Sequence, residues 1–430
     1  MKNRVVKEFY TDCTWTAPAG VSSVVVYGDY NKQTSIDFSN ATSFGIDVSG
    51  TTYSWGVFNC GILGDNTAGA SRCTPLKICC NLVFKKVSAN GNSAGGLTQD
   101  GIAYMWGGNI FGALGDGTAT SRCQPVRVCG NLRFKELSVG VCSSAGITPE
   151  GCMFTWGANP GGGLGDGTTT NRCCPVAVCG GLRFSKVSVG NGTTLAITCD
   201  GCLYSWGYNF SGRLGDGTTT NRCCPSAVCT NLRFRHVFIS GDHAGYGVTC
   251  DGDGYAWGDN SVGQFGTCCA PDVFCCPVPV CASFKWKMIN GTAGIDCDGC
   301  AYGWGWNVGG YIGDGTTTGR CCPVPVCGGL RFKQIISKGF TTVAEGCDGR
   351  FYSWGTNSSG MLGDGTITNR CCPVAVCGWL LSYSNLPSPR LTLPVIPGTT
   401  YAVNMFTFYA MFGGFPVKNI QDKLILEYWA

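Results

Sequence analysis

Cysteine is the residue type whose number and spacing in this chain could do chemistry. The 430 residues include 32 cysteines, and the phrase TNRCCPVAVCG stands unchanged at 170–180 and at 368–378. Cysteine at such density serves a metal centre, a thiol redox centre or a set of structural disulfides. The spacing of the cysteines, and the elements that carry them, decide among the three.

The spacing disfavours a metal or redox centre. Zinc and iron–sulfur sites usually combine two CxxC pairs or a set of Cys and His. CDGC occurs at Cys199–Cys202 and Cys297–Cys300, but the other equivalent positions keep at most one of the two cysteines. The sequence has no CxxCH for covalent haem, and no CxxC in the βαβ setting of a thioredoxin-like pair. We therefore expect structural disulfides, with no metal and no cofactor.

The cysteines sit in a repeat of about 50 residues. A Trp-Gly pair and a Gly-rich turn, LGDGT or a variant of it, mark each copy, and the fifth copy has a degenerate turn. A fixed period of this length indicates a repeat architecture. The pairs begin at Trp55, Trp106, Trp156, Trp206, Trp257, Trp304 and Trp354.

One unit, 184–230, contains four strand-like segments. FSKVSVG and TTLAITC are rich in β-branched residues, and Asp200–Gly201 predicts a two-residue hairpin before CLYSWG. Proline in CCPSAVC places the fourth segment at a sheet edge, because proline cannot donate to the ladder. Four strands in each of seven units predict an all-β fold, a seven-bladed β-propeller, with the tryptophans filling the contacts between blades.

The repeat resembles the regulator of chromosome condensation repeat. The shared pattern, DG-x-x-Y-x-WG-x-N-x-x-G-x-LGDGT-x-x-x-R-x-x-PV-x-V, covers about 33–380. The resemblance implies a seven-bladed propeller, in a family that includes a nucleotide-exchange factor for a small GTPase, bacterial effectors and an inhibitor of β-lactamase. Members bind partners through loops that differ in each, so no exchange activity is carried over.

The two chain ends do not fit the repeat. Both are strand-like, and we expect them to pair into one small β-domain of residues 1–32 and 384–430, flanking a propeller of residues 33–383. Together they resemble the glycine-rich β-domain of phage tail-fibre proteins, without its poly-Gly middle. The matching residues are Trp15, Pro18, Gly20, Val21, Pro397, Gly398, Thr399, Tyr401, Glu427 and Tyr428.

Each unit has an outer pair of cysteines six residues apart. Six residues of strand span roughly 20 Å, whereas a disulfide needs Cα atoms within about 7 Å. The members of a pair must therefore bond neighbouring strands or units, as in a chain of links around the ring. These seam cysteines are Cys73/Cys79, Cys123/Cys129, Cys173/Cys179, Cys223/Cys229, Cys275/Cys281, Cys321/Cys327 and Cys371/Cys377.

An inner cysteine follows the first outer one in five units. It is absent from the first two units, where Thr74 and Gln124 replace it, and a cysteine before the DG turn of the following unit is absent in parallel. This co-occurrence predicts the disulfides Cys174–Cys199, Cys224–Cys250, Cys276–Cys297 and Cys322–Cys347. Cys13 is a possible partner of Cys372, and no partner is assigned to Cys60, Cys80 or Cys142.

The turn aspartates have two readings. An Asp before Gly usually bonds its own turn, and the recurrent arginine, such as Arg172, would anchor that turn. A ring of Ca²⁺ sites is the alternative. The aspartates are Asp65, Asp116, Asp166, Asp216, Asp314 and Asp364. His236 and His243, the two histidines, have no recurrent nucleophile or carboxylate beside them.

Composition limits the function. Charged residues are 13% of the chain and the net charge is +4 with no basic run, which disfavours nucleic-acid binding. No apolar stretch is long enough to span a membrane. The N-terminus lacks the apolar segment of a secretory signal, yet the cysteine content favours an oxidising location: extracellular, cell-surface or virion.

We expect a non-enzymatic structural or adhesive protein, a subunit of an extracellular fibre, filament or virion appendage. It would assemble with copies of itself through the terminal β-domain, and could bind a host or surface protein or a glycan. The alternative is a soluble binding module, an effector or inhibitor, that grips one protein with a propeller face. Its contact residues would be Phe58, Phe111, Tyr208 and Phe210. A glycan-cleaving enzyme is a third class, disfavoured because no paired carboxylates recur outside the turns.

Overall fold

The computed structural model describes two compact units. One comprises residues 1–33 with 381–430, and the other comprises residues 34–380. The ranges that the structure describes are 4–9, 13–16, 19, 23–29, 35–39, 41–47, 50–66, 71–79, 81–239, 244–267, 273–377, 391–394, 397, 400–403 and 423–429.

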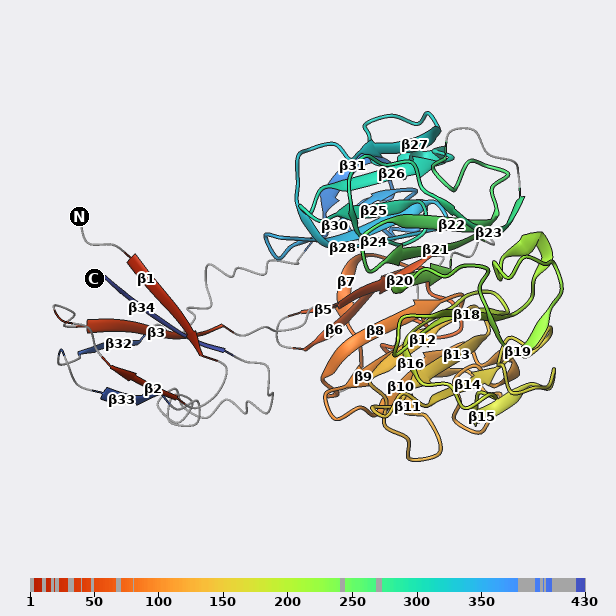
Figure 1. The fold of residues 1–430 in the computed structure, drawn as a ribbon, viewed down its shortest axis with the longest axis horizontal. Coiled ribbons are helices and arrows are strands. Elements are labelled where there is room, and N and C mark those ends of the chain that lie inside the picture. Colours follow the sequence, from red (N-terminus) through yellow and green to blue (C-terminus); the bar gives the residue numbers. More distant parts are fainter. Residues whose placement is uncertain are drawn as a thin grey trace. The chain divides into compact units, whose positions relative to one another are not determined.

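The larger unit is the seven-bladed β-propeller that the repeat predicted (Figure 1). Each blade is a four-stranded antiparallel sheet whose strands follow one another in chain order. Blade 1 has β4 (Ser35–Phe38), β5 (Thr42–Ile46), β6 (Thr52–Gly56) and β7 (Arg72–Lys77); blade 2 has β8 (Phe84–Asn90), β9 (Ser93–Thr98), β10 (Ala103–Gly107) and β11 (Arg122–Arg127); blade 3 has β12 (Glu136–Val139), β13 (Ser143–Ile147), β14 (Met153–Gly157) and β15 (Arg172–Ala177).

The other four blades repeat this pattern. Blade 4 has β16 (Phe184–Val189), β17 (Thr193–Thr198), β18 (Leu203–Gly207) and β19 (Arg222–Ala227); blade 5 has β20 (Phe234–Ile239), β21 (Ala244–Thr249), β22 (Gly254–Asp259) and β23 (Val273–Pro279); blade 6 has β24 (Trp286–Ile289), β25 (Ala293–Asp296), β26 (Ala301–Gly305) and β27 (Arg320–Pro325); blade 7 has β28 (Phe332–Lys338), β29 (Thr341–Gly346), β30 (Phe351–Gly355) and β31 (Arg370–Ala375).

The first strand of each blade lies innermost. First strands of consecutive blades contact one another all the way round, and β28 of blade 7 contacts β4 of blade 1. The fourth strand is the outer edge of each sheet and alternates between half-buried and exposed residues. The ring is therefore closed, and its cysteine-proline strands form the rim where proline is tolerated.

The apolar core lies between blades. One cluster joins Leu97 and Met105 of blade 2 to Phe134 and Trp156 of blade 3, all of them buried. In every blade the register shifts at the Trp-Gly pair, as between Thr155 and Gly157 where β14 meets β15. Gly157 has a φ of 103°, and a Cβ there would lie 2.4 Å from the Cys142 carbonyl oxygen. Glycine after the tryptophan is thus required by its backbone conformation and by the close approach.

The smaller unit joins both chain ends. Strands β1 (Arg4–Phe9), β34 (Lys423–Trp429), β3 (Ser23–Asp29) and β32 (Leu391–Pro394) form one sheet in this order, and β2 (Cys13–Thr16) pairs with β33 (Thr400–Val403). All these pairs are antiparallel. Of the residues that carry the tail-fibre resemblance, Pro397 is an exposed turn residue; the others lie outside the described residues or have side chains that are not described.

Three short 3₁₀ turns, η1 (Ile110–Gly112), η2 (Phe210–Gly212) and η3 (Val308–Gly310), follow the Trp-Gly pairs of blades 2, 4 and 6. Within the described ranges, no helix has the length and apolar character needed to cross a membrane.

Candidate functional site: blade seams and the loop face

Each seam between blades is built around a buried tryptophan. Trp156 of blade 3 is fully buried and its Nε1 donates to the Ala113 carbonyl oxygen of blade 2 at 3.0 Å. A Cβ on Gly115 would lie 2.7 Å from the same indole ring. The tryptophan therefore fills the contact between two sheets and binds the turn of the preceding blade. Equivalent bonds join Trp55 to Met361, Trp106 to Ile62, Trp257 to Arg213 and Trp304 to Gln264; Trp206 and Trp354 are equally buried.

A buried asparagine organises the long turn before the outer strand in blades 2, 3, 4, 6 and 7. Asn159 Nδ2 donates to Asp166 Oδ1 at 3.1 Å and to the carbonyl oxygens of Thr168 and Thr170 at 3.0 and 3.2 Å. Its Oδ1 accepts from the Leu164 amide at 2.9 Å. The sequence interpretation assigned this residue no role, although an asparagine stands two positions after the Trp-Gly pair in every blade except the first. Its equivalents are Asn109, Asn209, Asn307 and Asn357.

The turn aspartate is held by the protein itself. Asp166 Oδ1 accepts from the Thr168 amide and hydroxyl, and Oδ2 accepts from Arg172 Nε at 2.9 Å. The prediction that the recurrent arginine anchors the turn is confirmed. Ion pairs of this kind recur at Arg72–Asp65, Arg122–Asp116, Arg222–Asp216, Arg320–Asp314 and Arg370–Asp364.

This environment makes the aspartate a structural anion. Burial raises the pKa of Asp166, but hydrogen bonds from Thr168 and Arg172 outweigh it, and the net pKa lies below its usual value. Both carboxylate oxygens have protein donors, so the geometry does not favour the calcium alternative. Within the described ranges, no three His, Cys, Asp or Glu side chains gather in a way that could hold a metal ion.

Disulfides join the outer strands of consecutive blades. Cys129, just after β11, bonds Cys174 on β15, with Cα atoms 6.0 Å apart. Cys179 bonds Cys224 in the next seam, with Cα atoms 5.9 Å apart. Each bond closes a sequence separation of 45 residues, for which the chain-entropy model gives about 4 kcal/mol. Cys327–Cys372 repeats the link between blades 6 and 7, and Cys322 is also disulfide-bonded.

The pairings expected from co-occurrence are wrong. Cys174 and Cys224 bond the preceding blade, not Cys199 and Cys250. Cys276–Cys297 and Cys322–Cys347 are not formed in the structure either, where Cys276, Cys297 and Cys347 are free thiols. The proposed Cys13–Cys372 bond is also wrong, since Cys372 bonds Cys327.

Strand position explains the error. Cys199 follows β17, and its amide donates to the Arg183 carbonyl oxygen of the ladder between β17 and the innermost strand, β16. Cys174 is on an outermost strand, and its partner Cys129 directly follows the outermost strand of the preceding blade. For Cys174, Cys224 and Cys372 the correct signal was the second outer cysteine of the preceding unit. Cys199, Cys250, Cys297 and Cys347 are exposed thiols, Cys142 is half-buried and Cys60 is exposed; Cys80 and His243 lie outside the described residues.

The first outer cysteine has a backbone role. The Cys223 carbonyl oxygen of blade 4 accepts from the Gly167 amide of blade 3 at 3.0 Å. A Cβ on Gly162 would lie 2.6 Å from the Cys223 Cα, so the two chains touch. The same backbone bond closes the ring, from Gly365 of blade 7 to Cys73 of blade 1, at 3.0 Å. The free seam thiols are Cys73, Cys79, Cys123, Cys173, Cys223, Cys229, Cys275, Cys281, Cys321, Cys371 and Cys377.

The face formed by the loops after first and third strands, which we call the loop face, exposes apolar side chains. Trp306 and Phe340 of adjacent blades are 51% and 45% exposed, and their rings contact at 5.9 Å. Of the aromatics expected there, Phe111 and Phe210 are about half exposed, whereas Phe58 and Tyr208 are more buried. Further exposed apolar residues of these loops are Ile110, Val262, Val308 and Ile367.

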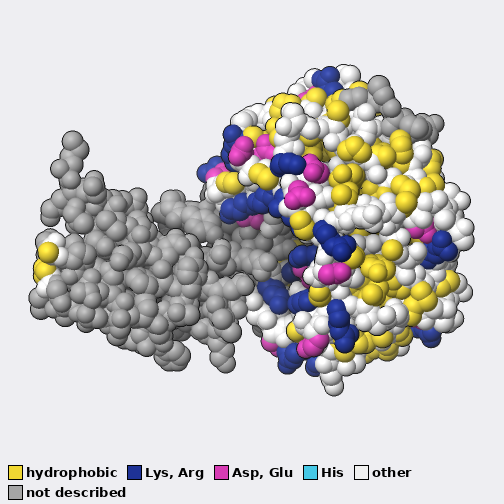
Figure 2. Space-filling model, viewed as in Figure 1, with side chains coloured by type: hydrophobic (Ala, Val, Ile, Leu, Met, Phe, Trp, Pro, Cys, Tyr) yellow, Lys and Arg dark blue, Asp and Glu magenta, His cyan; other side chains and the backbone are white. Residues whose placement is uncertain are grey.

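The opposite face carries charged side chains of both signs. Glu136 on β12 bonds Lys86 of blade 2 and Lys186 of blade 4, at 2.5 and 2.7 Å. Burial raises the pKa of Glu136, but the two ammonium groups outweigh it and bring that pKa to about 2. Arg133–Asp100 is an exposed pair near the same innermost strands. Figure 2 shows such cations and carboxylates intermixed in a band across the propeller.

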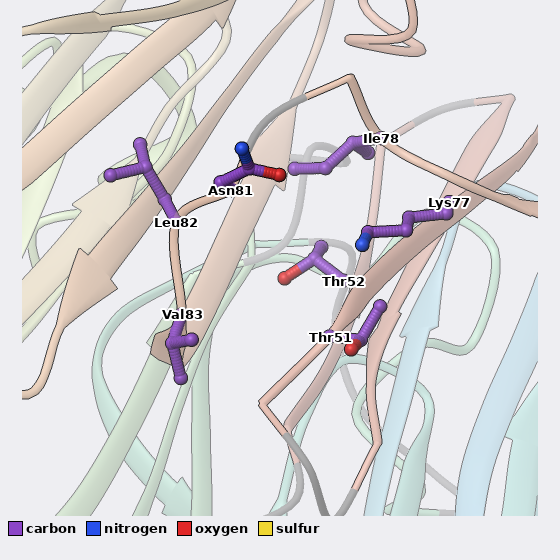
Figure 3. A pocket seen from close by; sticks show the side chains of 7 residues that line it. All are labelled: Thr51, Thr52, Lys77, Ile78, Asn81, Leu82 and Val83. Atoms are coloured by element: carbon purple, nitrogen blue, oxygen red, sulfur yellow. The ribbon is translucent and has the colours of Figure 1, made fainter.

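A small pocket lies at the seam between blades 1 and 2. Thr51, Thr52 and Lys77 line it from blade 1, and Leu82 and Val83 from the connection to blade 2 (Figure 3). Ile78 and Asn81 complete the lining. These seven residues include one cation and no carboxylate, thiol or imidazole. The pocket therefore holds no acid–base or nucleophilic pair with which to catalyse a reaction.

The seams, the turn network and the ring closure define a seven-bladed propeller, and two of its repeats match the regulator of chromosome condensation (RCC1) repeat. Residues 150–197 and 200–246 match the RCC1 repeat, and residues 184–213 match a second form of it. No curated protein is a significant match to the chain.

Solved structures share this fold. Human WBSCR16 superposes with a TM-score of 0.64 at 17% identity, over 82% of this chain and 94% of that one. Prp20p from Saccharomyces cerevisiae, described with its binding to Gsp1p and histones, gives 0.65 at 16% identity, over 84% and 87%. At such identities the likeness shows the fold alone.

Proposed function

We propose that this chain is a non-catalytic, protein-binding propeller that engages its partner through the loop face. The observation that carries the proposal is the exposure of Trp306 and Phe340 in ring contact on adjacent blades. Exposed apolar clusters on soluble proteins mark interaction sites, and aromatic residues dominate interface energies.

The rigidity of the ring supports this role. The apolar residues that follow the third strands of blades 2, 4, 6 and 7 are attached to turns that a buried asparagine and an Arg–Asp pair hold, as Asn209 and Arg222 do beside Phe210. Side chains displayed on rigid elements lose little conformational entropy on binding. Prp20p, which has the same fold, is described as binding Gsp1p and histones. We do not transfer these partners to this chain, because its proposed contact residues lie in loops, which differ between propellers of one fold.

The disulfides support an oxidising location. Cys129–Cys174 and Cys179–Cys224 would be kept reduced in most cytosols. We therefore propose a location outside the cell, on a cell surface or on a virion.

The test is affinity capture with matched variants. The full chain is immobilised as wild type, as Trp306→Ala/Phe340→Ala, and as the opposite-face control Arg133→Ala/Asp100→Ala. A partner retained by wild type and control but lost by the loop-face variant supports the proposal. Retention by all three, or loss only with the control, contradicts it.

A second candidate function is that of an assembling subunit of a fibre, filament or virion appendage. It is favoured by the separate unit in which both chain ends pair, with β34 between β1 and β3. Light scattering of the full chain should then report a multimer that persists in Trp306→Ala/Phe340→Ala. A monomer contradicts this role, and a multimer lost in the variant assigns self-association to the loop face instead.

A further inference from the structure

The seam between blades 4 and 5 holds two thiols side by side. Cys229 follows β19, and Cys276 lies on β23, the outer strand of the next blade. Both sulfur atoms lie 3.8 Å from the position that a Cβ on Gly217 would occupy. A hydrogen bond between the two thiols, together with burial, raises the pKa of Cys276 to about 11. In the structure both are free cysteines.

The backbone around these thiols repeats the frame of a formed disulfide. The Cys229 amide donates to the Gly215 carbonyl oxygen at 2.8 Å, as the Cys179 amide does to Gly165 at 2.9 Å. The Gly217 amide donates to the Cys275 carbonyl oxygen at 2.9 Å, and its equivalent Gly167 donates to Cys223 at 3.0 Å. Cys229 and Cys276 thus occupy the positions of Cys179 and Cys224, which are bonded.

The tryptophan side of the seam matches too. Gly215 packs on Trp257 of blade 5 as Gly165 packs on Trp206 of blade 4, with closest Cβ approaches of 2.8 and 2.5 Å to the indole. Both tryptophans are fully buried. The two sheets therefore meet in the same way in both seams, and no movement of a blade is needed to join the sulfur atoms.

We propose that Cys229 and Cys276 form a further inter-blade disulfide by exchange with a small-molecule disulfide such as oxidised glutathione. One protein thiolate attacks the oxidant, its S–S bond breaks, and a mixed disulfide and one glutathione thiol result. The second protein thiolate then displaces the other glutathione. Two protein thiols are oxidised, one oxidant disulfide is reduced, and the two protons pass to the released thiols.

This bond extends the covalent path through the ring. Disulfides already join blades 2 to 3 and 3 to 4, so a bond between Cys229 and Cys276 ties blades 2 to 5 into one cross-linked series. Blade 1 is not part of this cross-linked series. Gln124 of blade 2 stands opposite Cys79 of blade 1, and Thr74 of blade 1 holds the position that would face Cys377 of blade 7.

Peptide mapping of the full chain tests the proposal. The protein is equilibrated with oxidised glutathione, free thiols are alkylated under denaturing conditions, and the digest is analysed without reduction. A peptide pair linked through Cys229 and Cys276 is expected, alongside Cys179–Cys224 as the internal positive control and Cys79 without an intramolecular partner. Free or glutathionylated Cys229 and Cys276 in a sample whose Cys179–Cys224 bond is complete would overturn the proposal.

The variant Cys276→Ser gives a second readout, which does not require detection of the Cys229–Cys276 disulfide itself. In Cys276→Ser, Cys229 has lost its partner and should accumulate as a mixed disulfide with glutathione, while Cys179–Cys224 still forms and reports that the fold is intact. A bond from Cys229 to another cysteine of the chain in wild type would also refute the assignment.

Discussion

Gln124 faces Cys79 across the seam between blades 1 and 2, with its Nε2 4.0 Å from the cysteine sulfur. In the next two seams the position of Gln124 is taken by Cys174 and Cys224, each bonded to the preceding blade. The seam between blades 1 and 2 thus lacks a disulfide at this place because Gln124 stands where the next two seams have a cysteine. The backbone contacts around the position are otherwise similar in the three seams.

Gln124→Cys should create a disulfide with Cys79. The two positions are 45 residues apart, the separation closed by the native bonds, so the chain-entropy model gives a gain in stability of about 4 kcal/mol at most. Peptide mapping without reduction would detect the bond, and thermal unfolding with and without reductant would measure its effect.

Gln124→Ser is the matched control for this experiment, since it removes the amide without adding a thiol. Equal unfolding temperatures for the cysteine and serine variants under oxidising conditions would show that the seam frame does not bring position 124 to Cys79.

Trp156→Ala should destabilise the propeller strongly. The change empties a fully buried contact between blades 2 and 3 and removes the hydrogen bond to Ala113, for which large-to-small core substitutions cost about 3–5 kcal/mol. Denaturant unfolding measures the loss. Trp306→Ala, at a half-exposed tryptophan, should stay within about 0.5 kcal/mol of wild type; equal losses would contradict the role of the seam.

Asn159→Ala should loosen the long turn of blade 3. The side chain is fully buried and bonds Asp166, two carbonyl oxygens and the Leu164 amide, so unpaired buried groups would cost about 1–3 kcal/mol. Thr169→Ala, at an exposed position of the same turn, is the control. Hydrogen exchange of the 160–170 segment should accelerate only in Asn159→Ala; unchanged exchange would argue that the arginine pair alone holds the turn.

Glu136→Gln should remove part of the acid dependence of stability. The folded-state pKa of about 2 lies below the ordinary value of 4.5, so the contribution of Glu136 is present above pH 4.5 and is lost as the pH falls toward 2. Wild type should exceed Glu136→Gln in stability at pH 6, and the difference should shrink across that window. A difference independent of pH would indicate lost packing rather than a lost charge.

The propeller was predictable because its signals are local and repeated. The Trp-Gly period, the DG hairpins and the proline of the outer strand gave the blades and the position of the edge. The disulfide partners were not predictable in the same way, because the approach of Cys129 to Cys174 depends on how two consecutive blades pack. The inner cysteine and the cysteine before the next DG turn are both missing from the first two units, which suggested Cys199 as the partner of Cys174. Cys199 lies near the innermost strand of its blade. The loop-face aromatics were found in part: Trp306 occupies the variable position of the WG-x-N pattern in blade 6, where the repeat gives no signal.

The inter-blade bonds also decide what a protease can release. A cut between residues 130 and 173, or between 180 and 223, opens the backbone inside a loop that Cys129–Cys174 or Cys179–Cys224 closes. The two fragments stay joined until the sulfur bridge is reduced. A cut near Asn66 in blade 1 is spanned by none of the three bonds. Of the long turns before the outer strands, those of blades 3, 4 and 7 lie inside a loop closed by one of these bonds and can be cut without release of a fragment, whereas those of blades 1, 2, 5 and 6 are enclosed by none of the three.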